Sequence, residues 1–189
     1  MAFDCIEGIS QNLVNSCENP PILGLGDKAY FFNYDELTAT KSLTLKSLVT
    51  DLAVAIGKKG FTAQGHKKSM NAKNELVPSD QFPDTYKQTF DFVLWAKDAA
   101  TVDAILKLNK VVVIVERDDK GIAGNSAFAI YGLDTPLYKV TTTQEDNVDN
   151  GVFKLSLAAE NQRVPYYSFF DTDYATSKAT LEALLVVQV

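Results

Sequence analysis

The chain has 189 residues, of which 46% are apolar, and its formal net charge at pH 7 is −6. This length and apolar content suit one well-packed domain and argue against disorder over the whole chain. The negative charge argues against a protein whose main task is to grip nucleic-acid phosphates, and against one that binds membrane surfaces, because both kinds are usually basic. No stretch of the sequence approaches the roughly 20 apolar residues that a membrane-spanning helix needs.

Residues 1–27 are predicted to form an irregular arm that lies on the domain or on a neighbouring copy. Two successive prolines and three glycines interrupt this stretch. Cys5 and Cys17 could pair, but two free thiols in a reducing cytoplasm are the expectation. Residues 1–17 have neither a basic head nor a continuous apolar core, so a secretory signal is not expected. The remainder, residues 28–189, is predicted to fold as a single β-rich domain.

Four strands are predicted in the first part of this domain. Their ranges are 29–34, which is rich in aromatic residues, 43–47, 52–56 and 61–64, with a glycine-containing turn between the last two. The periodic pattern then disappears over residues 65–84, where lysines, asparagines and prolines replace it. This stretch is predicted to be a long polar loop, and a loop of that length in a compact domain usually has a function outside it.

The clearest pattern is a strand, a short helix and a second strand in the middle of the chain. Residues 85–95 alternate, with Phe90, Phe92 and Leu94 on one face. Asp98 is predicted to cap a helix in which Val102, Ile105 and Leu106 point inward. The β-branched run at 111–115 predicts a strand that is covered on both faces.

The rest of the chain is predicted to consist of strands, turns and a final helix. The predicted strands are 127–132, 137–143, 152–158 and 164–170, and the turns are 118–125 and an acidic turn at 145–151. Asp173 is predicted to cap the C-terminal helix, whose inward residues are Ala175, Leu181, Leu184 and Leu185. The fold class that follows is α+β and mainly β: a β-sandwich or barrel-like set of antiparallel sheets, paired mostly between sequential strands, with one flanking helix and a C-terminal helix.

Several short patterns approximate known sites without matching one. Gly60 and Gly65 have the spacing of a phosphate-binding loop, but His66 stands where that loop needs lysine. His66 is the only histidine and has no Ser, Cys or carboxylate at a telling spacing, so a surface position is expected. Asp146, Asn150 and Gly151 resemble part of a calcium loop, but Val148 and Leu157 stand at two of its ligand positions. No catalytic, cofactor-binding or metal-ligating residue is therefore predicted.

Two further features are open to more than one interpretation. Asp171 and Asp173 are candidates for a metal-binding or catalytic pair, but Asp173 is more simply a helix cap with Asp171 beside the same helix dipole. The chain is acidic overall, and the one local excess of positive charge is a basic cluster. Its members are Lys58, Lys59, His66, Lys67, Lys68 and Lys73. Contact with nucleic acid is one interpretation of this cluster. A solvated tip, or a patch that meets an acidic face on another subunit, is favoured because the rest of the chain is acidic.

Several of these signals occur in one order along most of the chain. The N-terminal segment MAFDCIEGISQNLVNSC leads through a glycine-rich stretch to AYFFNY, and GFTAQGHKKS enters the long polar loop. Then follow TYKQTFDFVLWA, the short helix DAATVDAILKLN, KVVVIVERDDKG, FAIYGL and GVFKLSLAAEN. In this combination the chain resembles phage tail tube and related head-to-tail ring proteins, most of all those of phages that infect Bacteroidetes.

The resemblance implies a virion structural protein without catalysis, made in the cytoplasm of the bacterial host. Subunits of that family are β-sandwiches that form rings, hexameric in the form expected here, and the rings stack into a conduit. The implied partners are other copies of the chain, other tail or connector proteins, and DNA that passes through an acidic lumen without specific binding, and no cofactor or membrane is implied. The long loop would cross a ring boundary, and the residues assigned to that contact are Lys67, Lys68, Lys73, Phe82 and Asp84.

Two other kinds of function stay open at the level of the sequence. One is a capsid decoration protein or another non-catalytic binding module, which would have a discrete partner and would not stack on itself. The other is an enzyme that uses carboxylates such as Asp171 and Asp173.

Overall fold

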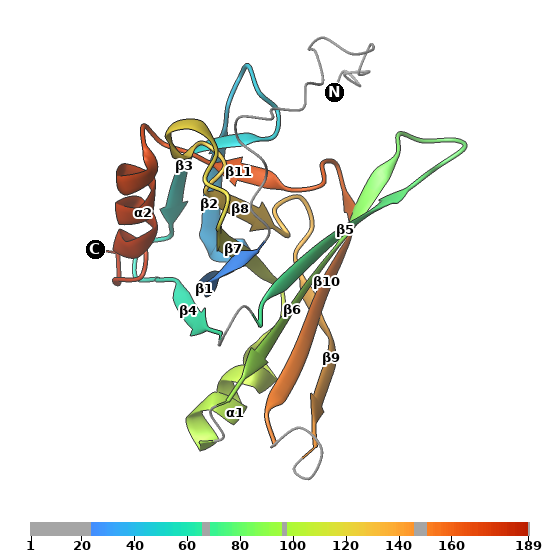
Figure 1. The fold of residues 1–189 in the computed structure, drawn as a ribbon, viewed down its shortest axis with the longest axis vertical. Helices are drawn as coiled ribbons and strands as arrows, with labels where there is room; N and C mark the ends of the chain where they lie inside the picture. Colours follow the sequence, from blue (N-terminus) through green and yellow to red (C-terminus); the bar gives the residue numbers. More distant parts are fainter. Residues whose placement is uncertain (1–23, 66–68, 96–97, 146–150, 189) are drawn as a thin grey trace.

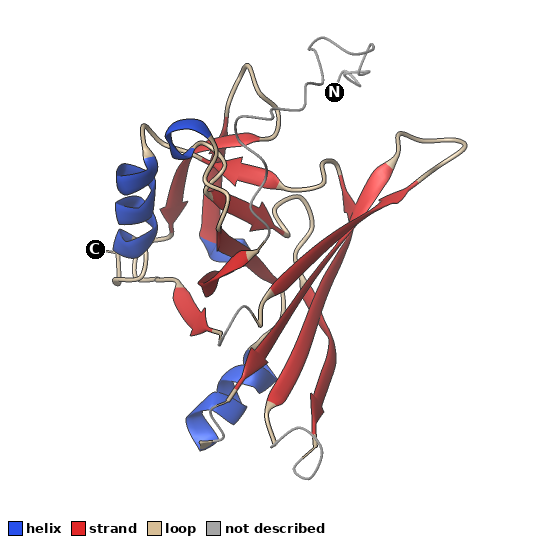
Figure 2. Ribbon diagram, in the orientation of Figure 1, coloured by secondary structure: helices blue, strands red, loops and turns tan. Residues whose placement is uncertain are grey.

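The computed structural model of the chain describes residues 24–65, 69–95, 98–145 and 151–188, and the predicted arm lies largely outside these ranges (Figures 1 and 2). The fold is α+β and mainly β, as the sequence predicts. The strands are β1 (Leu25–Asn33), β2 (Leu37–Lys41), β3 (Leu48–Val54), β4 (Phe61–Gln64), β5 (Asn71–Val77), β6 (Thr85–Leu94), β7 (Val111–Arg117), β8 (Phe128–Tyr131), β9 (Tyr138–Gln144), β10 (Phe153–Gln162) and β11 (Tyr167–Phe169). The helices are α1 (Ala99–Lys107) and α2 (Tyr174–Ala183).

The strands form two sheets. The seven-stranded sheet has the order β2-β3-β11-β8-β7-β1-β4, and the four-stranded sheet has the order β5-β6-β10-β9. All pairings are antiparallel except that of β11 with β3. Among the described strands, only four of the nine pairings join neighbours in the sequence: β2–β3, β5–β6, β7–β8 and β9–β10. The expectation of mostly sequential pairing is therefore wrong.

The seven-stranded sheet is the middle of three layers, because α2 covers one face and the four-stranded sheet covers the other (Figure 1). Strand β7 shows this arrangement residue by residue. Val113 and Val115 pack toward the four-stranded sheet, whereas Val112 and Ile114 pack on the side of α2. All four are buried, which confirms the prediction that the β-branched run is a strand covered on both faces.

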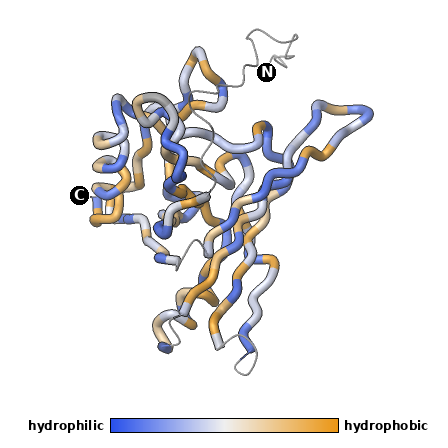
Figure 3. The backbone as a smooth tube through the Cα atoms, viewed as in Figure 1, coloured by the Kyte–Doolittle hydropathy of each residue, from blue (hydrophilic) through white to orange (hydrophobic). Residues whose placement is uncertain are grey.

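The four-stranded sheet has one apolar face and one polar face. Phe90 and Phe92 of β6 lie on the inner face and pack against Phe31 of β1, at ring-centroid distances of 6.1 and 5.4 Å. Hydrophobic and hydrophilic residues follow one another along these long strands (Figure 3). In the part of the chain that the structure describes, neither a helix nor another sheet covers the outer face.

Both α-helices begin where the sequence predicts. The carboxylate of Asp98 accepts a hydrogen bond from the backbone N–H of Thr101, and that of Asp173 accepts one from Thr176, so each caps its helix. The prediction of inward-facing side chains is wrong for some residues of these helices. Ile105 is buried, but Leu106 is 68% exposed and Ala175 is also exposed. Helix α1 is thus held by a narrower apolar stripe than its sequence suggests.

Two segments differ from the sequence-based prediction. Residues 43–47 form a turn with Leu43 fully exposed, and the hairpin strands are β2 and β3 on either side of it. Residues 71–77, predicted as part of the polar loop at 65–84, form β5, which pairs with residues 85–91 of β6. Strand β5 looks polar in sequence because it lies at a sheet edge with one uncovered face, so it needs few apolar residues.

Candidate assembly surface

Each edge of the four-stranded sheet is a strand that is paired on its inner side only, among the described residues. Strand β5 pairs with β6 alone, and β9 pairs with β10 alone, among the residues that the structure describes. Each edge strand has seven residues. Leu137, just before β9, exchanges two backbone hydrogen bonds with Val111 at 2.9 and 3.0 Å, which ties the start of β9 to the seven-stranded sheet. The outer backbone N–H and C=O groups of β5 and β9 are available for pairing with another strand.

The outer face of this sheet is polar, and its charges balance. The register places on it the lysines and carboxylates Lys73, Lys87, Lys154, Glu75, Asp91 and Glu160, together with several threonines. Lys73 forms an ion pair with Glu75, and Lys87 forms one with Glu160 at 3.5 Å. The face therefore has no excess of positive charge that would hold a phosphate backbone.

The hairpin of β5 and β6 ends in a projecting turn, residues 78–84, which we call the hairpin tip (Figure 1). The carboxylate of Asp84 accepts a hydrogen bond from the backbone N–H of Ser79 at 3.0 Å. The Ser79 hydroxyl accepts one from the backbone N–H of Phe82 at 3.1 Å, so the turn is fixed by its own side chains. The side chain of Phe82 is 73% exposed.

The structure thus places only part of the predicted inter-subunit loop in one location. Phe82 and Asp84 lie in the hairpin tip, whereas Lys73 lies within the strand β5 and not in a loop. Lys67 and Lys68 lie outside the described residues, as does His66.

An apolar groove opens at the opposite end of β6. It has a volume of about 890 Å³ and lies between α1, the end of β6, and the strands β1 and β4. We call it the α1 groove. The aromatic and apolar residues that line it are Phe31, Phe32, Phe61, Ala63, Phe92, Leu94, Trp95, Ala100, Ala104, Ile105, Leu108 and Val111.

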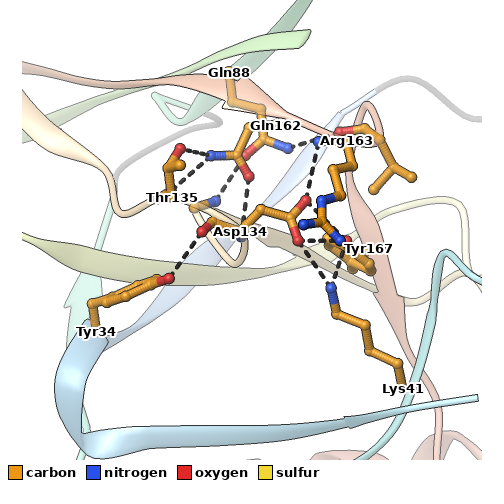
Figure 4. A network of polar contacts seen from close by, with 10 residues as sticks. Tyr34, Lys41, Gln88, Asp134, Thr135, Gln162, Arg163 and Tyr167 are labelled. Atoms are coloured by element: carbon orange, nitrogen blue, oxygen red, sulfur yellow. Dashed lines mark hydrogen bonds and ion pairs between the residues drawn. The ribbon is translucent and has the colours of Figure 1, made fainter. Parts of the chain in front are cut away.

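A buried polar network joins the two sheets near β2 and β11 (Figure 4). Its centre is Asp134 in the turn between β8 and β9. The Asp134 carboxylate accepts hydrogen bonds from the Lys41 ammonium at 2.9 Å, from the Tyr167 hydroxyl at 2.8 Å and from the Arg163 backbone N–H at 3.0 Å. The Tyr34 hydroxyl donates to the Asp134 carbonyl at 2.9 Å.

Two fully buried glutamines hold the same turn. Gln88 accepts a hydrogen bond from the backbone N–H of Gly132 at 2.7 Å, and its amide donates to the Pro165 carbonyl at 2.8 Å. The Gln162 amide donates to the Thr135 carbonyl at 2.7 Å. Each glutamine therefore replaces backbone pairing that an irregular turn cannot provide.

The pKa shifts in this network keep Asp134 ionised and Tyr167 protonated, which suits a structural role and not proton transfer. Burial alone would raise the pKa of Asp134, but the hydrogen bonds from Lys41, Arg163 and Tyr167 outweigh burial and hold that pKa below its usual range. Burial and the adjacent Asp134 carboxylate raise the pKa of Tyr167, so this phenol keeps its proton. None of these residues lines the α1 groove.

The other sequence candidates have local structural roles where they are described. Asp173 caps α2, and the Asp171 carboxylate accepts a hydrogen bond from the Thr172 hydroxyl at 3.0 Å. The basic cluster is dispersed: Lys58 pairs with Glu36 at 2.8 Å beside the seven-stranded sheet, whereas Lys73 is in the four-stranded sheet.

The described part of the chain has neither a metal-binding cluster nor a membrane-spanning helix. No group of three or more His, Cys, Asp or Glu residues there is arranged to hold a metal ion. Neither helix in those ranges is long and apolar enough to span a membrane. The calcium-like turn falls mostly outside the described residues.

No family model matches the chain, and no curated protein or solved structure is significantly similar to it.

Sequence reasoning missed the polar network and the α1 groove. Gln88 is the signal that could have indicated the network, because it falls on the face of β6 that also carries Phe90 and Phe92. A polar residue at such a position needs a buried partner. The groove had no comparable signal, since it depends on how β4 and α1 approach each other in three dimensions.

Proposed function

We propose that the protein is a phage virion structural protein, a subunit of a tail tube or of a related connector ring. Copies assemble into rings that form a conduit for DNA. The observation that carries the proposal is the four-stranded sheet with two unpaired edges and an uncovered polar face. A monomer with two such edges is prone to uncontrolled pairing, whereas a closed ring satisfies both edges with neighbouring copies.

Strand direction supports pairing of β9 in one copy with β5 in the next. The four strands of the sheet alternate in direction, so β5 and β9 run in opposite directions. A rotation about an axis roughly parallel to the strands keeps these directions. It therefore brings β9 against the neighbour's β5 in antiparallel orientation, and repetition extends one antiparallel sheet around the ring. A head-to-tail contact of this kind closes when the rotation divides a full turn.

The outer face of the sheet becomes the wall of the conduit in this arrangement. Its three lysines and three carboxylates balance, which differs from the acidic lumen that the resemblance implies. A wall without net positive charge releases few counterions from DNA and binds it weakly, so DNA can move past it.

Cysteine cross-linking tests the proposed edge contact. In a Cys5→Ser/Cys17→Ser background, Lys73→Cys places a thiol on the outer face of β5, and Thr141→Cys places one on the same face of β9. A short bismaleimide should convert the Lys73→Cys/Thr141→Cys protein into a ladder of covalent oligomers that ends at one ring size. A mixture of the two single variants should stop at dimers that contain one chain of each.

Each alternative gives a distinct result. Two-fold pairing of like edges would cross-link one single variant with itself. A protein that stays monomeric at high concentration, with no cross-linking of the double variant, would overturn the proposal and favour a decoration or other binding module.

A further inference from the structure

We infer that residues 4–17 of the N-terminal arm form an amphipathic helix that docks into the α1 groove of the same chain. The contact is intramolecular, so it does not depend on the ring contact proposed above and is present in a monomer. The groove presents an uncovered apolar surface, the arm has an apolar stripe in its sequence, and the linker between them has the length that the contact requires.

The α1 groove exposes large apolar side chains. Phe61 on β4 and Trp95 just after β6 are 54% and 58% exposed, and both line the groove. On the α1 side, the exposed residues Ala100 and Ala104 stand one helical turn apart and line it as well. Side chains this small let a second helix approach α1 closely. The groove is thus suited to the apolar face of a helix.

Only one segment outside the described residues is long enough to fill a groove of about 890 Å³. The segments 66–68, 96–97, 146–150 and 189 have at most five residues each, whereas residues 1–23 of the arm make up 23. Covering exposed apolar surface stabilises a protein by about 25 cal/mol per Å², so an apolar part of the arm gains free energy in the groove.

The arm has the apolar periodicity of an amphipathic helix. Apolar residues at intervals of three and four lie on one helix face, and in the arm these are Ile6, Ile9, Leu13 and Cys17. Asp4 stands as an N-cap before them, with Glu7 three residues later in the spacing of a capping box. Of the prolines and glycines that predict an irregular arm, only Gly8 falls between residues 4 and 17. A helix this short is marginal in water, so it forms by packing its apolar face.

The linker after Cys17 matches the distance to the groove of the same chain. Leu25 begins β1 and packs on the same side of the sheet as Phe31, which lines the groove. The six residue steps from Leu25 to Phe31 cover about 20 Å at 3.3 Å each. The eight steps from Cys17 to Leu25 include Pro20 and Pro21 and reach at most about 25 Å in the extended form that prolines favour. A linker that just spans its distance gives the highest effective concentration, which favours the chain's own groove over that of a neighbour.

Trp95 provides a direct measurement, because it is the only tryptophan of the chain and lines the groove. In the full-length protein, Ile6→Ser/Ile9→Ser should lower the population of the docked arm roughly tenfold or more, since two isoleucines lose their burial. The emission of Trp95 should then shift to longer wavelength, and the helical circular dichroism signal should fall. Ile22→Ser/Leu23→Ser is the matched control, because it makes two equivalent changes in the linker, and it should change neither signal.

A second variant blocks the groove without changing the arm. Ala104→Glu introduces a charge on the groove wall at an exposed helix position that tolerates glutamate, and Leu106→Glu places the same charge on α1 outside the groove. Ala104→Glu should lower the helical signal as Ile6→Ser/Ile9→Ser does, whereas Leu106→Glu should leave it unchanged. Because the two changes break the same contact, combining Ala104→Glu with Ile6→Ser/Ile9→Ser should cause no further loss.

The native cysteines of the arm distinguish the chain's own groove from that of a neighbour. Ala104→Cys adds a thiol on the groove wall to the native Cys5 and Cys17. In an equal mixture of isotope-labelled and unlabelled protein, a short bismaleimide should join this thiol to one of the native thiols within a single chain, as mass spectrometry can show. Leu43→Cys is the control and should not link to the arm, because its turn joins β2 and β3 at the sheet edge opposite β4.

Three results would overturn the docked helix. The first is a Trp95 emission and a helical signal that Ile6→Ser/Ile9→Ser leaves unchanged, or that Ile22→Ser/Leu23→Ser changes equally. The second is the absence of any link between the Ala104→Cys thiol and the arm. The third is links that join only labelled to unlabelled or otherwise different chains, which would place the arm in the groove of a second copy. Failure of the ring proposal alone would leave all of these signals as expected here, because the contact lies within one chain.

Discussion

Asp134 links the two sheets through hydrogen bonds from Lys41, Arg163 and Tyr167. Its side chain is 9% exposed, and it receives hydrogen bonds from three different segments of the chain. A buried carboxylate of this kind is stable only while those donors are present. Lys41 is more than a third exposed, so solvent screens part of its attraction, and the uncharged donors supply the remainder.

Replacement of this carboxylate by an amide keeps the shape and removes the charge. We expect Asp134→Asn to lower the free energy of unfolding by about 2–3 kcal/mol, because three hydrogen bonds lose their charged acceptor. Urea titration followed by circular dichroism measures the change. Asp51→Asn, at an exposed position of β3, is the control and should change the stability by less than about 0.5 kcal/mol.

The pH dependence of the same variant has a definite sign. Because the pKa of Asp134 is lowered in the folded protein, its contribution is complete above the ordinary aspartate pKa of about 4 and is lost as pH falls through the folded value. The stability difference between wild type and Asp134→Asn should therefore be constant near neutral pH and shrink below about pH 4. A difference that grows on acidification would contradict this role.

At the scale of the elements, strands are located best from the sequence where they are fully buried. The strands β6 and β7 were correctly located because their apolar residues face a core, in alternation along β6 and as a continuous run in β7. Helix α1 was located by its cap, Asp98, although Ile105 is its only buried residue. Strand β5 was missed because an edge strand with a polar outer face has no such period. Residues 43–47 alternate by coincidence in an exposed turn, which pattern alone cannot distinguish from a strand.

The connection between β8 and β9 contains a closely packed glycine, Gly132. Gly132 has a φ of +79°, and an added Cβ would lie 3.0 Å from both the Leu137 nitrogen and the Val111 oxygen. Gly57 has nearly the same φ, +78°, but an added Cβ there would meet nothing within 4 Å. The two positions share a left-handed φ and differ in how crowded they are.

This pair separates backbone strain from steric overlap. Gly57→Ala should cost about 1 kcal/mol of stability, which is the strain of a left-handed alanine. Gly132→Ala should cost about 3 kcal/mol, because the backbone must also shift where Leu137 bridges the two sheets. Thermal unfolding of both variants measures the difference. Equal losses of stability in the two variants would show that the backbone near Leu137 shifts at no cost in free energy.

At the scale of the whole molecule, the candidate assembly surface could be predicted only in part from the sequence. Phe82 and Asp84 were predicted to lie in a long polar loop at 65–84, and the structure has them in the shorter hairpin tip. The unpaired edges of the four-stranded sheet could not be predicted, because its central pair, β6 and β10, joins strands about 60 residues apart whose pairing no local pattern encodes. Which strands lie at an edge follows only once such long-range pairings are known.

The proposed ring contact can be blocked at a single position on its β9 side. Val140 lies at the irregularity in the pairing of β9 with β10 and is 64% exposed, so a lysine there fits the monomer. A charged side chain on an edge strand opposes pairing with another strand, so Val140→Lys should abolish rings and higher oligomers in sedimentation velocity and electron microscopy. Val186→Lys is the matched control, since Val186 is 67% exposed beyond α2 and away from the sheet edge. Both variants should unfold within about 0.5 kcal/mol of wild type, because neither change buries a charge. Oligomers that survive Val140→Lys, or that are lost equally in Val186→Lys, would show that the β9 edge does not form the contact.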